Sequence, residues 1–168
     1  VVRHRRSIMA LLKKAEKKCS VLFVDSLNDL SSQLAEYYTR KFYPGLYDVY
    51  SAGPKHEIVD CDLLSVMYCN GEDLRDQVSK DFADERFLPK DNQFDIVVYT
   101  EKGVFDSLAH KSPWQGRQIC AHMGCRDEFT ATDDAELAEQ LLAMADRVSA
   151  WVKENMDDPE KLRSLVSA

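Results

Sequence analysis

The chain has 168 residues, of which 45% are apolar and 30% are charged, a composition typical of a globular protein with one buried core. It has no apolar run long enough for a membrane-spanning helix, and we expect no secretory signal because its N-terminal stretch is charged. The five cysteines are an odd number without paired spacing, which argues against a disulfide framework and against a zinc site. We therefore expect reduced thiols in a cytoplasmic protein that holds neither a metal nor a cofactor.

The net charge of −7 is unevenly distributed, because residues 1–18 are strongly basic and the rest of the chain is acidic. An acidic body repels phosphates, so nucleic acid is not the expected partner. A helix is expected over 7–18, where apolar residues such as Leu11 recur at helical spacing with lysines opposite. This helix either packs on the acidic body, which we favour, or forms an arm for a membrane surface or a nucleic acid. We divide the chain into a basic helical extension, 1–18, and one domain, 19–168.

Beyond this extension, apolar segments rich in β-formers alternate with segments of helical spacing. The expected elements, in chain order, are a strand at 20–24, a helix at 32–42, a strand at 47–51, a helix at 61–69, a charged surface excursion at 79–93, a strand at 94–100, a short helix near 104–110, a strand at 117–121 and a long helix capped by Asp133 and Asp134. The apolar face of the long helix comprises Leu137, Leu141, Met144, Ala145, Val148 and Val152. This alternation predicts an α/β fold with three layers, in which a four-stranded, mostly parallel sheet carries helices on both faces.

The loop after the first strand is the candidate binding site, since ligands of such sheets bind at the carboxyl ends of the strands. The loop leads directly into a helix, and its residues are Asp25, Ser26, Leu27, Asn28, Asp29, Leu30, Ser31 and Ser32. A strand, loop and helix of this length can direct backbone N–H groups at an anion, and the helix dipole adds to the attraction.

Here the sequence resembles the low-molecular-weight tyrosine phosphatases and the related arsenate reductases. In that family an apolar strand is followed by Cys, five residues, Arg and Ser, and the fold is the three-layer α/β fold expected above. The positions of this chain that match the family pattern are Asn28, Ser32, Ala35, Glu36, Arg40, 50–53 (YSAG), Val59, Asp60, Asn70, Gly71, 78–80 (VSK), 94–98 (FDIVV) and 122–127 (HMGCRD). The resemblance extends from about residue 20 to residue 155, and its specificity comes from the order and spacing of the motifs.

The resemblance fails at the residues that carry the family's chemistry. Asp25 stands where the family has its nucleophilic Cys, and Ser31 stands where it has the Arg that binds phosphate. A carboxylate repels a phosphate dianion, and a hydroxyl cannot replace the fork of a guanidinium. Asp127 matches the general acid, but Glu128 replaces the Pro that follows it. Without a nucleophile Asp127 has no leaving group to protonate, so we expect a solvated loop aspartate and no catalytic residue.

The resulting hypothesis is a phosphatase-fold protein without phosphatase activity, a pseudoenzyme that acts by binding a protein or a small ligand. The sequence leaves open whether the chain also forms a homo-oligomer. The alternative is a weakly active phosphatase or arsenate reductase, or a phosphoryl-transfer enzyme that uses Asp25 as its nucleophile. Aspartyl-phosphate enzymes of the dehalogenase type place a second Asp two residues after the first, and that position is Leu27 here. They also use magnesium, which requires more carboxylates than the sequence places nearby.

The loop itself is expected to keep the shape that cradles an anion, with Asn28 helping to hold it. We expect the Asp25 carboxylate to turn inward and accept hydrogen bonds from the loop N–H groups, in place of phosphate. Such hydrogen bonds would depress the pKa of Asp25. The competing expectation is an outward Asp25 and a collapsed loop whose polar groups are satisfied by water.

Overall fold

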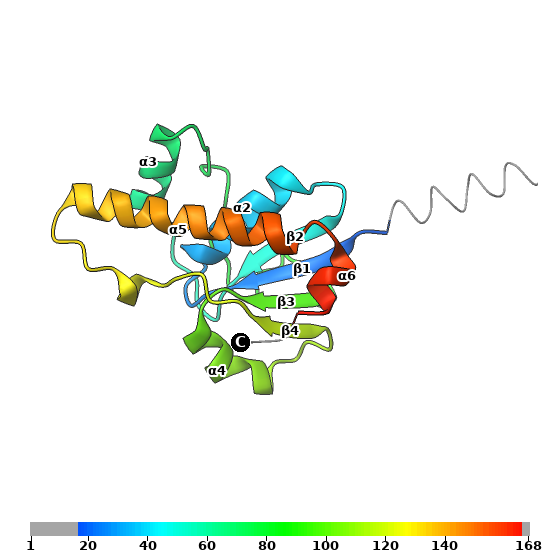
Figure 1. Cartoon of the computed structure of the whole chain (residues 1–168). Helices are drawn as coiled ribbons and strands as arrows, with labels where there is room; N and C mark the ends of the chain where they lie inside the picture. The colour runs from blue at the N-terminus through cyan, green and yellow to red at the C-terminus, as the bar shows by residue number, and fades with distance from the viewer. Residues whose placement is uncertain (1–16, 166–168) are drawn as a thin grey trace, which may run out of the picture.

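The computed structural model describes residues 17–165, and four parallel strands form its single sheet (Figure 1). The strands are β1 (Cys19–Val24), β2 (Tyr47–Ala52), β3 (Ile96–Tyr99) and β4 (Arg117–Cys120), in the order β2-β1-β3-β4. All four predicted strands are confirmed, although β3 is shorter than the expected 94–100. The ends of β1 and its neighbours are in register, since Val24 pairs with Ala52 of β2 and with Tyr99 of β3. The loop after β1 therefore leaves from the middle of the sheet.

The helices lie where the apolar spacing predicts them, with one addition. They are α2 (Ser31–Phe42), α3 (Cys61–Cys69), α4 (Lys102–Leu108), α5 (Asp134–Asn155) and α6 (Pro159–Arg163), together with the short 3-10 turns η1 (Ala109–Lys111) and η2 (Arg126–Glu128). Asp133 caps α5 as expected, because its side chain accepts the N–H of Glu136. The added helix is α6, which begins at Pro159 after the cap Asp158.

Helices cover both faces of the sheet, and this makes the expected three layers (Figure 1). Val21 and Phe23 of β1 point to the face that α2 and α5 cover, whereas Leu22 and Val24 point to the face that α4 covers. All four side chains are fully buried, which explains why β1 is continuously apolar. On α5 the expected apolar face is buried except for Leu137, which packs against the core while remaining partly exposed.

The expected N-terminal helix lies outside the described residues except for Lys17 and Lys18, which have no regular secondary structure. The division into an extension, 1–18, and a domain, 19–168, therefore stays a prediction. Between residues 17 and 165, no helix has the length and apolarity that a membrane crossing requires.

Candidate functional site

Asn28 holds the shape of the loop that joins β1 to α2. Its backbone is in the left-handed region with φ 49°, which asparagine tolerates better than most residues. Its side-chain nitrogen donates to the hydroxyl of Ser32 at 2.9 Å, and its side-chain oxygen accepts from the backbone N–H of Lys80 at 2.8 Å and from Gln33 at 2.9 Å. The loop is therefore tied both to α2 and to the segment that follows residue 78. The expected role of Asn28 is confirmed.

The carboxyl end of β2 packs directly against this loop at Gly53. A β-carbon built on Gly53 would lie 2.7 Å from the carbonyl oxygen of Asp25 and 3.0 Å from the backbone nitrogen of Asn28. Both neighbours are backbone atoms, so they cannot move aside as a flexible side chain would. Glycine at this position therefore allows the backbone of β2 to support the loop from one side.

Asp25 occupies the loop with its own carboxylate. The side chain points inward and the residue is only 2% exposed. One carboxylate oxygen, Oδ2, accepts the backbone N–H of Ser32 at 2.9 Å and that of Leu30 at 3.3 Å. The other oxygen, Oδ1, is buried and has no hydrogen-bond partner within residues 17–165. The expected inward orientation of Asp25 is confirmed. The backbone N–H groups of Leu30 and Ser32, which could hold a bound anion, donate to the Asp25 carboxylate instead.

The expected direction of the Asp25 pKa is wrong. Burial raises the pKa of Asp25 above its ordinary value, and the nearby charge of Glu101 adds to this effect. The hydrogen bonds from Ser32 and Leu30 act in the opposite direction but do not outweigh burial. The hydrogen bonds to the charged form can be expected from the loop residues, whereas the loss of solvent around the carboxylate depends on tertiary packing.

Further carboxylates surround the loop. Asp29 is 5% exposed, and burial raises its pKa to about 6, with a further contribution from the charge of Asp25. Glu101 follows β3 and accepts a hydrogen bond from the hydroxyl of Ser26 at 3.2 Å. Burial also raises the pKa of Glu101, and the charges of Asp127 and Asp29 add to the shift. This acidic surrounding opposes the binding of a phosphate dianion.

Ser31 does not take over the role of a phosphate-binding arginine. It is fully buried, and its hydroxyl shares a hydrogen bond of 2.8 Å with the hydroxyl of Thr100. Thr100 lies directly after β3, so this bond fastens the start of α2 to the neighbouring strand. The side chain of Ser31 is a packing element of the interior.

Arg126 brings a guanidinium to the loop, and the sequence did not predict this role. Arg126 lies in η2 and donates to Asp29 at 3.2 Å and to Asp60 at 2.5 Å. Asp60 also caps α3 by accepting the N–H of Leu63. Arg126 therefore joins the loop, α3 and η2, and its charge partly offsets the effect of burial on the pKa of Asp29. Asp127, the next residue, is exposed, as expected.

Behind the loop, residues that matched the family pattern meet in a buried network. Glu36 is 6% exposed and accepts a hydrogen bond from the hydroxyl of Ser51 at 2.7 Å. Its carboxylate also pairs with Arg40 at 3.1 Å and lies 3.9 Å from the amine of Lys80. The network links α2, β2 and the segment after residue 78, so these matched residues have a structural role.

A second polar group lies beside η2 and consists of His122, Cys125 and Glu128. Their ligand atoms lie within 4.8 Å of one another, and the residue types suit a metal ion. However, Nδ1 of His122 accepts the backbone N–H of Lys102 at 2.9 Å, which leaves the ring proton on Nε2. This Nε2 contacts Glu128, and it would have to lose its proton to bind a metal. The geometry therefore favours a hydrogen-bonded group over a set of metal ligands.

Comparison with known proteins shows what the fold is. Neither a protein-family model nor a curated protein matches the sequence. Solved structures do match. The tyrosine phosphatase AmsI of Erwinia amylovora superposes with a TM-score of 0.57 at 19% identity, covering 82% of this chain and 93% of that chain. A low-molecular-weight protein tyrosine phosphatase from T. tengcongensis superposes with a TM-score of 0.55 at 18% identity, covering 78% of this chain and 97% of that chain.

An arsenate reductase in a phosphate-binding state gives a TM-score of 0.56 at 20% identity, covering 82% of this chain and 98% of that chain. The chain has the low-molecular-weight phosphatase fold. The resemblance seen in the sequence is thereby confirmed at the level of the fold, over about four fifths of the chain. At identities of 20% or less the likeness does not extend to the reaction, which depends on the residues of the loop.

Proposed function

We propose that this protein acts by binding and does not hydrolyse phosphate esters, in spite of its phosphatase fold. The observation that supports the proposal is the position of Asp25. Its carboxylate accepts the N–H groups of Leu30 and Ser32, the donors that a bound phosphate would need. A phosphate dianion would have to displace this carboxylate and then lie against it.

The loop lacks the two groups that hydrolysis of a phosphate ester would need, an accessible nucleophile and a free guanidinium. Asp25 is 2% exposed, so its oxygens are not open to an in-line approach by a phosphorus atom. Ser31 is buried against Thr100, and the guanidinium of Arg126 is engaged by two carboxylates. None of the five cysteines lies in the loop. The functional partner is then a protein or a small ligand, and the free thiols support a reducing compartment such as the cytoplasm.

A second candidate function is phosphoryl transfer by Asp25. The observation in its favour is that the charges of Asp29 and Glu101 act near Asp25, since magnesium in phosphoryl-transfer enzymes is held by carboxylates. Within residues 17–165, however, these three carboxylates do not form a group whose ligand atoms are close enough to hold a metal ion. The burial of Asp25 argues against it, because a nucleophile must be reached by its substrate.

Hydrolysis of p-nitrophenyl phosphate, measured with and without magnesium chloride, tests both candidates. We expect no rate above that of the buffer, and no difference between the wild type and Asp25→Ala. Asp146→Ala is the matched control, since Asp146 is exposed on α5. Turnover that survives in the control and disappears in Asp25→Ala would overturn the proposal and establish an aspartyl nucleophile.

A further inference from the structure

A cavity lies behind the loop, between α2, the edge strand β2 and the segment that follows residue 75. Its volume is about 330 Å³, within the range of small-molecule sites. The lining residues that matter for its chemistry are Glu36, Arg40, Tyr50, Asp76, Lys80 and Phe87. No residue of the loop, 25–32, lines it, so what this cavity binds does not depend on whether the loop is active.

Arg40 is held in the wall of this cavity with part of its guanidinium free. One nitrogen, Nη2, donates to Glu36 Oε1 and to the backbone carbonyl of Val49, each at 3.1 Å. The other two nitrogens, Nη1 and Nε, donate to no group within residues 17–165. The side chain is 55% exposed, so a ligand can reach it. The guanidinium is therefore positioned by the fold and keeps N–H donors for a ligand.

Lys80 places a second positive charge beside the same carboxylate. Its side chain is only 4% exposed, and its amine donates to the carbonyl of Val78 at 2.6 Å. The amine lies 3.9 Å from Oε2 of Glu36, beyond hydrogen-bonding distance. Burial lowers the pKa of Lys80, and the attraction of Glu36 is too weak to restore it; the charge of Arg40 adds to the lowering. Two cations thus share the one buried carboxylate of Glu36, which does not balance both.

The cavity also has aromatic walls. Phe87 is 47% exposed and is one of the large apolar side chains that the fold leaves open to solvent. Tyr50 is partly buried, and its ring packs edge-on against Phe94 at a centroid distance of 5.7 Å. A ligand in the cavity can therefore cover apolar surface that is otherwise exposed to water.

We propose that this cavity binds the carboxylate of a small organic acid, whose apolar part lies against Tyr50 and Phe87. The free N–H groups of Arg40 suit the two oxygens of a carboxylate. The charge of Lys80 attracts the anion through the protein interior and does not have to touch it. A cation in the same place would be repelled by Arg40 and Lys80.

The other carboxylates near the cavity have cations of their own. Asp76 lines the cavity, but it is exposed and its charge acts on the neighbouring Arg75. Asp84, whose charge acts on Lys80, pairs with Arg86 at 3.3 Å. A singly charged group is enough to balance the cations, whereas a doubly charged one would add repulsion from Glu36.

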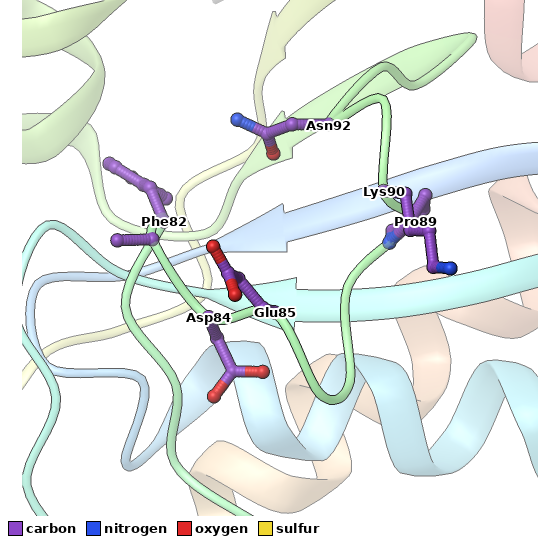
Figure 2. A pocket seen from close by; sticks show the side chains of 7 residues that line it. Phe82, Asp84, Glu85, Pro89, Lys90 and Asn92 are labelled. Carbon is purple, nitrogen blue, oxygen red and sulfur yellow. The ribbon is translucent and has the colours of Figure 1, made fainter.

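A neighbouring hollow provides an internal control. It lies at residues 82–92 and is lined by Asp84 and Glu85, and the Lys90 amine points away from both carboxylates (Figure 2). This hollow has aromatic and acidic side chains but no guanidinium in its lining. An organic acid should therefore prefer the cavity at Arg40.

Titration of the whole chain with four probes, followed by amide NMR shifts, tests the assignment. The probes are phenylacetate, 2-phenylethanol without the charge, phenethylamine with the charge reversed, and acetate without the ring. We expect saturable shifts at 36–40, 49–50 and 76–80 with phenylacetate binding most tightly, and no saturable shift at Ala83 or Glu85. No saturable shift at the cavity, or phenethylamine binding as tightly as phenylacetate, would overturn the proposal.

Two variants separate the contributions. Arg40→Gln should weaken phenylacetate about tenfold, since a hydrogen bond to a charged group is lost, and leave 2-phenylethanol unchanged. Phe87→Ala should reduce the preference for phenylacetate over acetate. Arg163→Gln is the matched control, because Arg163 also lies on a helix, α6, and pairs with Glu160 three positions before it. Equal phenylacetate affinity in Arg40→Gln and in the control would contradict the site. An unchanged preference in Phe87→Ala would contradict it independently, and Phe87 is exposed enough for the fold to survive this change.

Discussion

The backbone N–H of Ser32, in the first turn of α2, donates a hydrogen bond of 2.9 Å to the carboxylate of Asp25, the residue that follows β1. The N–H groups at the start of a helix lack partners within the helix. In an anion-binding loop, they are satisfied by the ligand. In this protein two of them are satisfied by the chain itself, so the loop keeps its shape without a ligand.

The first prediction concerns the charge of Asp25. Because its pKa in the folded protein is raised, the stability that Asp25 contributes is present below its unfolded pKa and is lost as the pH rises through the folded pKa. Asparagine cannot ionise, so the Asp25→Asn variant should lose less stability than the wild type as the pH rises. Between pH 4 and pH 8 we therefore expect Asp25→Asn to gain stability relative to the wild type, measured by urea unfolding.

The control for this experiment is Asp146→Asn on the exposed face of α5, which should follow the wild type at every pH. If Asp25→Asn instead becomes progressively less stable than the wild type as the pH rises, the hydrogen bonds outweigh burial, and Asp25 acts as a stabilising anion.

The second prediction concerns Asp29 and Arg126. The guanidinium of Arg126 lies 3.2 Å from Asp29 and limits the rise of the Asp29 pKa, which is about 6. Arg126→Gln should therefore raise the pKa of Asp29 further. Titration of the aspartate side chains by carbon-detected NMR measures this directly. Arg75→Gln is the control, since Arg75 pairs with Asp73 and should leave the Asp29 titration unchanged. An unchanged Asp29 titration in Arg126→Gln would show that the ion pair does not persist in solution.

Much of the fold can be predicted from local sequence. The run from Val21 to Val24 is apolar at every position, which is the pattern of a strand covered on both faces. The cap of α5 at Asp133 and the loop-holding role of Asn28 were also predicted, because each depends on residues close in sequence or on a motif with fixed spacing.

The rest depends on contacts between distant segments. Arg126 donates a hydrogen bond to Asp29, 97 positions away in the sequence, and no spacing of residues predicts this contact. The burial of Asp25 depends on the packing of the segments around the loop, so the direction of its pKa could not be read from the loop residues alone. The short helix α6 escaped notice because it has only five residues, too few for a helical pattern to be recognised.

The third prediction tests the close packing at Gly53. Gly53→Ala places a methyl group 2.7 Å from the Asp25 carbonyl oxygen, so the loop must move. We expect a loss of about 1–3 kcal/mol in the free energy of unfolding. Gly103→Ala is the matched control, because its methyl group meets no atom within 4 Å and lies in α4, where alanine is favoured over glycine. Equal effects of the two substitutions would contradict the tight contact between β2 and the loop.

The last prediction introduces a cysteine and an arginine at the two loop positions on which the proposed function rests. Asp25→Cys removes the internal carboxylate, and Ser31→Arg supplies a guanidinium, which must turn outward because the Ser31 side chain is fully buried. The double variant should bind inorganic phosphate. At ten times the dissociation constant, this adds about 1.4 kcal/mol of stability, visible as a rise in melting temperature with phosphate. The wild type should show no such rise, and Asp25→Cys alone should show less, because it lacks the guanidinium.

Hydrolysis by the double variant should stay slow, since Asp29 and Glu101 remain beside the new thiol and their charges oppose the thiolate. Adding Asp29→Asn should therefore strengthen phosphate binding and raise the rate on p-nitrophenyl phosphate. A wild-type protein that phosphate stabilises as strongly as the double variant would show that Asp25 does not block the loop. If the double variant folds but Asp29→Asn has no effect on either quantity, the carboxylates around the loop are not what keeps phosphate out.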